Sequence, residues 1–523
     1  MQALRIMSAA GLALAMSACA TAPASPPPPA ATLGAFDRQQ DVGETAIAGA
    51  AAFGDGRYTV TGGGANIWGN VDAFHYVYTQ RSGDLHIAAD ISFVGAGGEE
   101  HRKAGLMIRQ NLTPGSPYVD VMVHGNGLTS LQYREVQDGP THQISSNVSA
   151  PTRVRLEREG NYAFFSVAGA DGQLRHAGGN FRIAFQEPYY VGLAVSAHNN
   201  ALSETATFSN VEMNAPHLAD VPDTGYPAAV ESTLEILDMS GGDMGDRRIV
   251  RHFTGVKIEA PNWSRDGRTL IYNSGGHLWS ISVDGGEPVM INTGDRVKLN
   301  NDHGLSPDGA QLMISDQTEA DNISRIYTLP LTGSDHPRLV VSHRTARSYW
   351  HAWTPDGRTI AYTASRPETG TDDYDIYAKA ANGRGRERNL THSMGLDDGP
   401  EYTPDGQYIY FNSTRSGAMQ IWRARARDGA NPERITTDET YRDWFPHFSP
   451  DGQRMAFVSF FANDVRVDDH PPNRDVQIRV QPTDRSAPPI IVTKLFGGQG
   501  TMNVPSWSPD GQYLAFVSYR LVR

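Results

Sequence analysis

Cysteine is nearly absent from this chain. Cys19 is the only one among 523 residues, so a disulfide within the chain is excluded. Basic residues are also outnumbered, because 45 lysines and arginines stand against 58 aspartates and glutamates, a formal net charge of −13. This balance argues against nucleic acid or anionic lipid as the main partner. Beyond the N-terminus, no apolar run is long enough to span a bilayer.

Several catalytic motifs are missing as well. The sequence contains no Gly-x-Ser-x-Gly elbow, no zinc-protease helix motif and no dinucleotide-binding fingerprint. The glycine-rich stretch Phe496–Thr501 is not followed by Lys-Ser or Lys-Thr, which a phosphate-binding loop requires. These absences argue against a serine peptidase, a zinc protease, a phosphate-binding loop and a dinucleotide-binding domain.

The N-terminus has the pattern of a secretory signal over residues 1–18. Arg5 precedes the short apolar run Ile6–Met16, which is too short to cross a membrane. The run ends in Met-Ser-Ala-Cys at Cys19, which resembles the lipobox of bacterial lipoproteins. That resemblance implies a lipid on Cys19 and attachment to the membrane through this lipid only. Because Ala20 rather than Asp follows, it also implies an outer-membrane lipoprotein, facing the periplasm or the cell surface.

The remaining chain divides at two proline-rich segments. Residues 19–33 carry the lipidated cysteine and a stiff spacer that includes Pro26–Pro29. Residues 214–229 contain three prolines without strong periodicity and are predicted to link two domains. The predicted domains are therefore 34–213 and 230–523.

The first domain shows short segments of alternating polar and apolar residues and no sustained helical spacing, which predicts an all-β sandwich. The predicted strands are 58–60, 85–93, 104–109, 119–123, 153–157, 163–167 and 190–196. The amino-acid sequence of the segments 65–69, 72–76, 104–109 and 191–199 resembles that of bacterial concanavalin A-like domains. Such domains accompany carbohydrate-active modules, so the resemblance implies glycan binding as one candidate function.

The second domain contains a repeat. A Ser/Thr-x-Asp-Gly turn, with proline at the second position in five copies, recurs at 264–267, 306–309, 354–357, 403–406, 449–452 and 508–511. Asp-Gly supplies the left-handed backbone of a tight hairpin, and proline presets the bend before it. The spacing, roughly 40 to 50 residues, is that of one propeller blade.

The first and last segments of this domain together supply the strands of one repeat. The last repeat stops after its second strand, whereas 233–239 and 247–253 match the third and fourth strands of other repeats. Pairing the first and last segments gives six blades without an open edge. The pattern resembles the TolB-like six-bladed β-propeller with PD40-type repeats. The predicted fold class is therefore all-β, a concanavalin A-like sandwich followed by a six-bladed TolB-like propeller.

Candidate functional residues precede the turns, on the strands predicted to line the central channel. These segments are rich in His, Asp, Asn and Trp, which bind metals, transfer protons and stack on sugars. Two longer loops, 468–475 and 496–501, are predicted at the same channel mouth. The ligand-binding candidates are Glu259, Asn301, Asp302, Trp350, Asp397, Trp444, His470, Arg474, Gln499 and Asn503.

His303 and His351 occupy equivalent positions on adjacent repeats, three residues before the Ser or Thr of the turn. Their rings could meet in the channel and bind a divalent metal with Asp302 or Asp398, act in acid–base catalysis, or hold strands together. The carboxylates on these segments could also include an acid–base pair of the glycosidase kind. The catalytic candidates are His303, His351, Asp398 and Asp443, and the metal candidates are His303 and His351.

Three functions remain open. The first is an envelope protein that binds a glycan or another small polar ligand at the channel mouth. The second is an oligosaccharide lyase or hydrolase that uses the same residues. The third is an interaction module that docks a protein partner, which the TolB-like resemblance implies through the fold alone.

Overall fold

The computed structural model describes residues 33–214, 230–241, 245–367 and 373–521. The predicted signal peptide, Cys19 and most of both predicted proline-rich segments lie outside these residues. The described residues are almost entirely strands, turns and loops. None of them forms a helix with the length and apolar character needed to cross a lipid bilayer.

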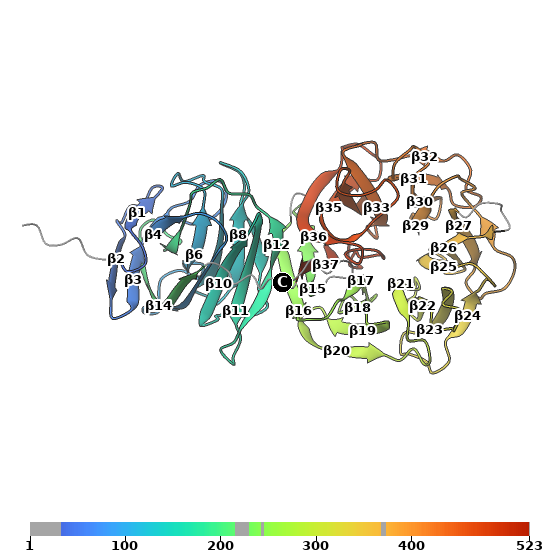
Figure 1. Ribbon diagram of the computed structural model, residues 1–523, viewed down its shortest axis with the longest axis horizontal. Coiled ribbons are helices and arrows are strands. Elements are labelled where there is room, and N and C mark those ends of the chain that lie inside the picture. The colour runs from blue at the N-terminus through green and yellow to red at the C-terminus, as the bar shows by residue number, and fades with distance from the viewer. Residues whose placement is uncertain (1–32, 215–229, 242–244, 368–372, 522–523) are drawn as a thin grey trace, which may run out of the picture. The chain divides into compact units, whose positions relative to one another are not determined.

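Two antiparallel sheets build the N-terminal half (Figure 1). In spatial order, the first contains β1 (Arg38–Val42), β4 (Phe74–Arg81), β13 (Tyr189–Ser196), β6 (Lys103–Arg109), β7 (Tyr118–His124), β8 (Thr129–Arg134) and β9 (His142–Ser145). The second contains β12 (Leu174–Arg182), β11 (Tyr162–Ala168), β10 (Arg153–Glu159), β5 (Leu85–Phe93), β14 (Glu204–Asn214), β3 (Arg57–Gly62) and β2 (Ala50–Gly54). Side chains from both sheets share one buried apolar cluster, so the sheets pack face to face.

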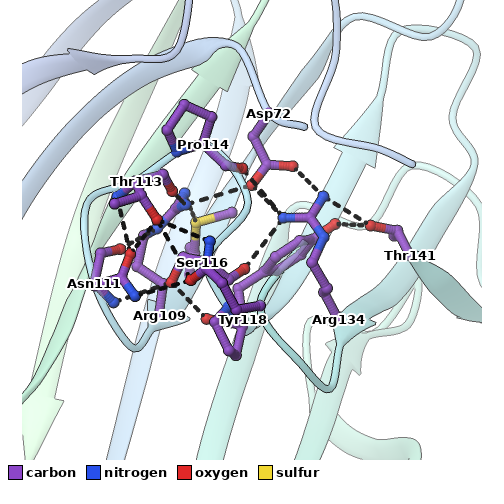
Figure 2. Close-up of polar contacts among 12 residues, drawn as sticks. Asp72, Arg109, Asn111, Thr113, Pro114, Ser116, Tyr118, Arg134 and Thr141 are labelled. Carbon is purple, nitrogen blue, oxygen red and sulfur yellow. Dashed lines mark hydrogen bonds and ion pairs between the residues drawn. The ribbon is translucent and has the colours of Figure 1, made fainter. Parts of the chain in front are cut away.

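The opposite face of the first sheet holds a buried ionic network (Figure 2). The two terminal nitrogens of the Arg134 guanidinium donate to the carboxylate of Asp72, at 2.7 and 2.8 Å, and Arg109 approaches the same carboxylate at 3.4 Å. All three side chains are fully buried. Arg109 also donates to the carbonyl of Thr113, so the network fixes the loop before β7 onto the sheet. A buried charge is tolerated because each one has a partner.

The C-terminal half contains five four-stranded antiparallel sheets, which are arranged around a centre in Figure 1. The first three are β17 (Glu259–Trp263), β18 (Thr269–Ser274), β19 (His277–Ser282), β20 (Gly285–Ile291); β21 (Leu299–Leu305), β22 (Gln311–Asp316), β23 (Arg325–Pro330), β24 (Arg338–Val341); and β25 (Ser348–Trp353), β26 (Thr359–Ser365), β27 (Tyr374–Ala380), β28 (Arg388–Asn389). The last two are β29 (Asp397–Tyr402), β30 (Tyr408–Ser413), β31 (Gln420–Arg425), β32 (Glu433–Arg434); and β33 (Tyr441–Phe448), β34 (Arg454–Phe461), β35 (Pro472–Pro482), β36 (Ile490–Gly498).

The first and last strands of this half pair with each other, as the sequence predicts. β15 (Val230–Asp238) is antiparallel to β37 (Tyr513–Leu521) along its whole length, and β16 (Arg247–Phe253) pairs with the other edge of β15. Trp507 adds a bridge to Leu514 on the free side of β37. β16 also pairs in parallel with β9, so the three strands extend the first sheet of the N-terminal half to ten strands.

Apolar side chains fill the spaces between neighbouring sheets. Separate buried clusters lie between each consecutive pair of the five sheets. Two further clusters join β15, β16 and β37 to the last sheet on one side and to the first on the other. The C-terminal half is therefore a ring of packed sheets, in which β15, β16 and β37 fill the space between the last and the first four-stranded sheet.

The repeated turns explain why each hairpin forms. In every copy the Ser or Thr hydroxyl donates to the Asp carboxylate at 2.5–2.7 Å, and the amide two residues after the Asp donates to the same oxygen. The glycine that follows has φ of 69–72°, which only glycine adopts at no steric cost. The Asp side chains therefore hold the backbone of these turns in place.

Candidate functional site

The inner strands of the five sheets share an irregularity. In each of β17, β21, β25, β29 and β33, the pairing register shifts before the repeated turn. Such bulges leave residues outside the ladder and redirect their side chains. The unpaired residues include Asn300–Asp302 on β21, His351 on β25 and Phe445 on β33.

These unpaired residues surround a cavity of about 330 Å³. The walls are formed by Asn300, Asn301, Asp302, Tyr349, His351, Thr363, Tyr374, Leu396, Asp398, Phe445, His470, Gln499 and Asn503. We call this cavity the channel-mouth pocket. Its lining combines amides, carboxylates, imidazoles and aromatic rings, and it draws on the second to fifth sheets and on three loops.

Asp398 is the best-connected acid of the channel-mouth pocket. One carboxylate oxygen accepts from the Thr363 hydroxyl at 2.8 Å and lies 3.2 Å from Nε2 of His351. The other oxygen is 3.7 Å from Nε2 of His470. Burial alone would raise the pKa of Asp398, but the bond and charge of His351, with smaller effects of His470 and Thr363, lower it to about 2.

Asp302 has a different environment, although it lies in the same pocket. Burial raises its pKa to about 6, the charge of His351 opposes this shift, and the charges of Asp398 and Glu259 add to it. Burial would lower the pKa of His351, but Asp302 and Asp398 together raise it. The two carboxylates therefore favour the protonated form of His351, which lies beside Asp398, and Asp302 titrates close to neutrality in the same pocket.

Aromatic rings form one wall of the pocket. The ring of Phe445 is stacked with that of His351 at 6.4 Å between centroids and meets His470 edge-on at 5.2 Å. Phe445 has a φ of 56°, which a bulky side chain rarely adopts, and Pro446 follows it. Asn412 holds this backbone in place, because its Oδ1 accepts from the Phe445 amide at 2.8 Å.

Polar residues on the second strands position the pocket. In the first four sheets the residue six positions after the turn glycine is polar and directly follows three apolar or aromatic residues: Asn273, Ser315, Thr363 and Asn412. Each bonds to the inner strand of the next sheet. These four residues were not among the candidates proposed from the sequence. The recurrence of a polar residue at the same position of four strands could have indicated them, because a buried polar group needs a hydrogen-bond partner.

Comparisons with known proteins concern the C-terminal half. The PD40 model, described as TolB beta propeller domain, matches residues 324–491. Uncharacterized protein Atu1656 of Agrobacterium fabrum is 46% identical over 298 residues, which are 57% of this chain and 95% of that protein. A solved Agrobacterium tumefaciens structure, provisionally assigned as TolB, is 45% identical with a TM-score of 0.51 and covers 56% of this chain and 100% of its own.

This chain belongs to the TolB-like PD40 propeller family. The Tol-Pal system protein TolB of Francisella tularensis is a more distant relative, 26% identical over 202 residues. That match covers 37% of this chain and 44% of the Francisella protein, so the chain spans less than half of that relative.

Seven of the residues proposed from the sequence of this TolB-like protein line the channel-mouth pocket. They are Asn301, Asp302, His351, Asp398, His470, Gln499 and Asn503. Gln499 and Asn503 are joined by a side-chain bond of 2.9 Å. The pocket also contains Asn300, Tyr349, Thr363, Tyr374, Leu396 and Phe445, which were not among the proposed ligand-binding residues.

The two candidate histidines lie in different environments. His303 is paired with Ile314 in the regular ladder of the TolB-like propeller, and its fully buried side chain does not line the pocket. His351 falls inside a bulge and faces the pocket. Burial lowers the pKa of His303 to about 4, so this ring is neutral at physiological pH. Among the residues that the structure describes, no group of three or more His, Cys, Asp or Glu side chains could hold a metal ion.

The other proposed acids have partners inside the TolB-like propeller. The carboxylate of Asp443 binds the Arg479 guanidinium at 2.8 and 2.9 Å, and Asp397 binds Arg415 at 2.9 Å. The carboxylate of Glu259 accepts from Lys257 at 2.7 Å. These three acids are outside the pocket lining.

The remaining candidates lie deeper in the propeller or at its surface. Trp350 is almost completely buried, and Trp444 is fully buried and packs edge-on against His470 at 4.2 Å between ring centroids. Arg474 is exposed, and its guanidinium bonds to the adjacent Asn473 carbonyl. Trp444 therefore supports the pocket from behind, whereas Arg474 does not face it.

Proposed function

We propose that the channel-mouth pocket binds a small polar ligand, and that this ligand is a glycan. The observation that carries the proposal is the lining itself, in which amides, acids and three aromatic rings converge on about 330 Å³. This volume lies at the lower end of the range typical of small-ligand sites. Aromatic rings stack on the apolar faces of sugars, while Asn301, Gln499 and Asn503 can bond to hydroxyl groups.

Calorimetric titration with neutral, amino and acidic oligosaccharides tests the proposal. Saturable binding that is lost in His351→Ala, while thermal unfolding remains cooperative, is the expected result. A matched control is His277→Ala, which changes a half-buried histidine on β19 outside the pocket lining. Absence of binding to every sugar would overturn the proposal.

A catalytic function is the second candidate, and one arrangement favours it. Asp302, with its pKa of about 6, is an acid that can donate or accept a proton near neutrality, and its charge raises the pKa of His351, which lies beside Asp398. Mass spectrometry of the same oligosaccharides decides the point. Cleavage that depends on Asp302 would establish an enzyme, and an unsaturated product would identify a lyase rather than a hydrolase.

A protein partner is the third candidate. The relatives include proteins named for the Tol-Pal system, which favours an interaction module at the level of the family. Recovery of one defined envelope protein on the immobilised chain, with no affinity for sugars, would replace the glycan proposal.

We further propose that β37, β15 and β16, with the bridge at Trp507, form the sixth blade of the propeller. The pairing of β15 with β37 and the apolar clusters on both sides of these strands support this assignment. The two packed sheets of the N-terminal half support a concanavalin A-like sandwich.

The envelope location is also a proposal and rests on the lipobox-like sequence at Cys19. A Cys19→Ser chain is expected to lose its lipid mass and to leave the membrane fraction. Retention of that variant in the membrane would overturn the anchor. The same proposal places the channel-mouth pocket outside the cytoplasm, where extracellular glycans are accessible.

A further inference from the structure

The charges around the channel-mouth pocket are unbalanced. Its lining contains two carboxylates and two imidazoles but no lysine or arginine. Arg347 affects the pKa of Tyr349, yet it is exposed and does not belong to the lining. An acidic sugar would therefore meet Asp302 and Asp398 without a permanent cation to bind its carboxylate, which is unfavourable.

Asp302 is the carboxylate of the pocket that has no hydrogen bond or ion pair with a cation among the described residues. The residue is only 6% exposed. Its Oδ2 accepts from the amide of Asn300, and no hydrogen bond to Oδ1 exists within the described part of the chain. His351 acts on it through its charge, but that imidazole is already bonded to Asp398. A buried carboxylate without a bonded cation is energetically unfavourable.

Other buried acids of the propeller show the contrast. Asp443, Asp397 and Glu235 are each bonded to an arginine at 2.6–2.9 Å. Asp302 is also buried but opens into the cavity instead. A ligand that carries a positive charge would supply the partner that the chain provides elsewhere.

We propose that the ligand is an amino sugar whose protonated amine binds the free carboxylate oxygen of Asp302. This inference rests on the function proposed above and specifies its substrate class. Tyr349, Tyr374 and Phe445 contact the sugar ring, and a cation beside such rings is additionally favoured. Asn503 and Gln499 bond to hydroxyl groups on the opposite side.

The test uses four disaccharides with the same β1→4 gluco skeleton: the glucosamine dimer, its N-acetylated form, cellobiose and the corresponding diuronic acid. Binding to the full-length protein in mild detergent is measured calorimetrically, with EDTA present throughout so that no metal mediates it. We expect the glucosamine dimer to bind about tenfold or more tightly than cellobiose, because a bond between charged partners replaces a neutral one. The diuronic acid should bind most weakly.

Asp302→Asn keeps the shape of the side chain and removes its charge. We expect this variant to lose the preference for the amine while its affinity for cellobiose changes less than about twofold. Asp484→Asn, on an exposed turn after β35, is the matched control and should keep the preference. Thermal unfolding of both variants shows whether the fold is intact.

The outcomes separate the two proposals. If cellobiose or the diuronic acid binds as tightly as the glucosamine dimer, the amine is not recognised, although the pocket still binds glycans. If none of the four binds, both proposals fail. Competition with the glucosamine dimer by free glucosamine but not by lysine supports an amino sugar as the ligand. Equal competition by lysine would overturn the claim that the pocket recognises the sugar ring. An unchanged preference in Asp302→Asn would overturn the assigned contact.

Discussion

Asp302 and Asp398 are the same type of residue in one pocket, and their surroundings separate their pKa values by several units. Asp398 is bonded to His351 and Thr363, which favour its charged form. Asp302 is buried beside other acids, which favours its neutral form. The contrast explains why, of these two acids, only Asp302 can change its protonation near physiological pH.

Asp302→Asn should stabilise the protein at pH 8 and have little effect at pH 4. The folded-state pKa of about 6 exceeds the unfolded value of 3.8, so ionised Asp302 destabilises the fold above pH 6 and the effect disappears below 3.8. A shift of this size corresponds to the order of 2–3 kcal/mol. Urea unfolding at both pH values measures it. Equal stability of variant and native chain at pH 8 would contradict the unpartnered state of Asp302.

Asp72→Ala should destabilise the N-terminal half strongly. The change leaves the buried guanidinium groups of Arg134 and Arg109 without their shared carboxylate (Figure 2). Breaking a buried ion pair by removing one partner costs about 3–5 kcal/mol. The midpoint of chemical unfolding reports the loss. Asp171→Ala, which removes an exposed pair with Arg175, is the control and should leave the midpoint unchanged.

The inner strands show what the sequence could and could not predict. The repeated turns, the strands around them and the pairing of β15 with β37 follow from residue patterns, and the structure confirms them. The bulges do not follow from those patterns, because a shift of one residue depends on contacts with the next sheet. His303 and His351 are therefore equivalent in sequence position, yet only His351 leaves the ladder. Phe445 enters the pocket for the same reason.

Phe445 offers a direct measurement of bulge strain. Phe445→Gly and Phe445→Ala both remove the ring, but only glycine adopts a φ of 56° without steric cost. The glycine variant should therefore be more stable than the alanine variant by about 1 kcal/mol, in the opposite order to that expected in an ordinary strand. Thermal unfolding of the two proteins compares them. A more stable alanine variant would show that the backbone at this position is unstrained.

The pairing of β15 with β37 closes the ring of sheets and so affects the whole C-terminal half. β37 contributes to two apolar clusters and pairs with β15 over its full length. A chain that ends at Gln512 lacks this strand and exposes the edge of β15, so it should aggregate or unfold. Size-exclusion chromatography tests this, with a chain that ends at Leu521 as the control. A monomeric, cooperatively folded protein without β37 would show that closure is dispensable.

The same pairing sets a time for folding during synthesis. Glu235 on β15 bonds to Ser518 on β37, and 283 positions separate them along the chain. At ribosomal rates of about 5–20 residues per second, β15 waits roughly 15 to 60 seconds for its partner. During that interval its edge is open to any other nascent strand. The folding chain therefore needs to be kept from pairing with other unfolded chains until β37 has been synthesised.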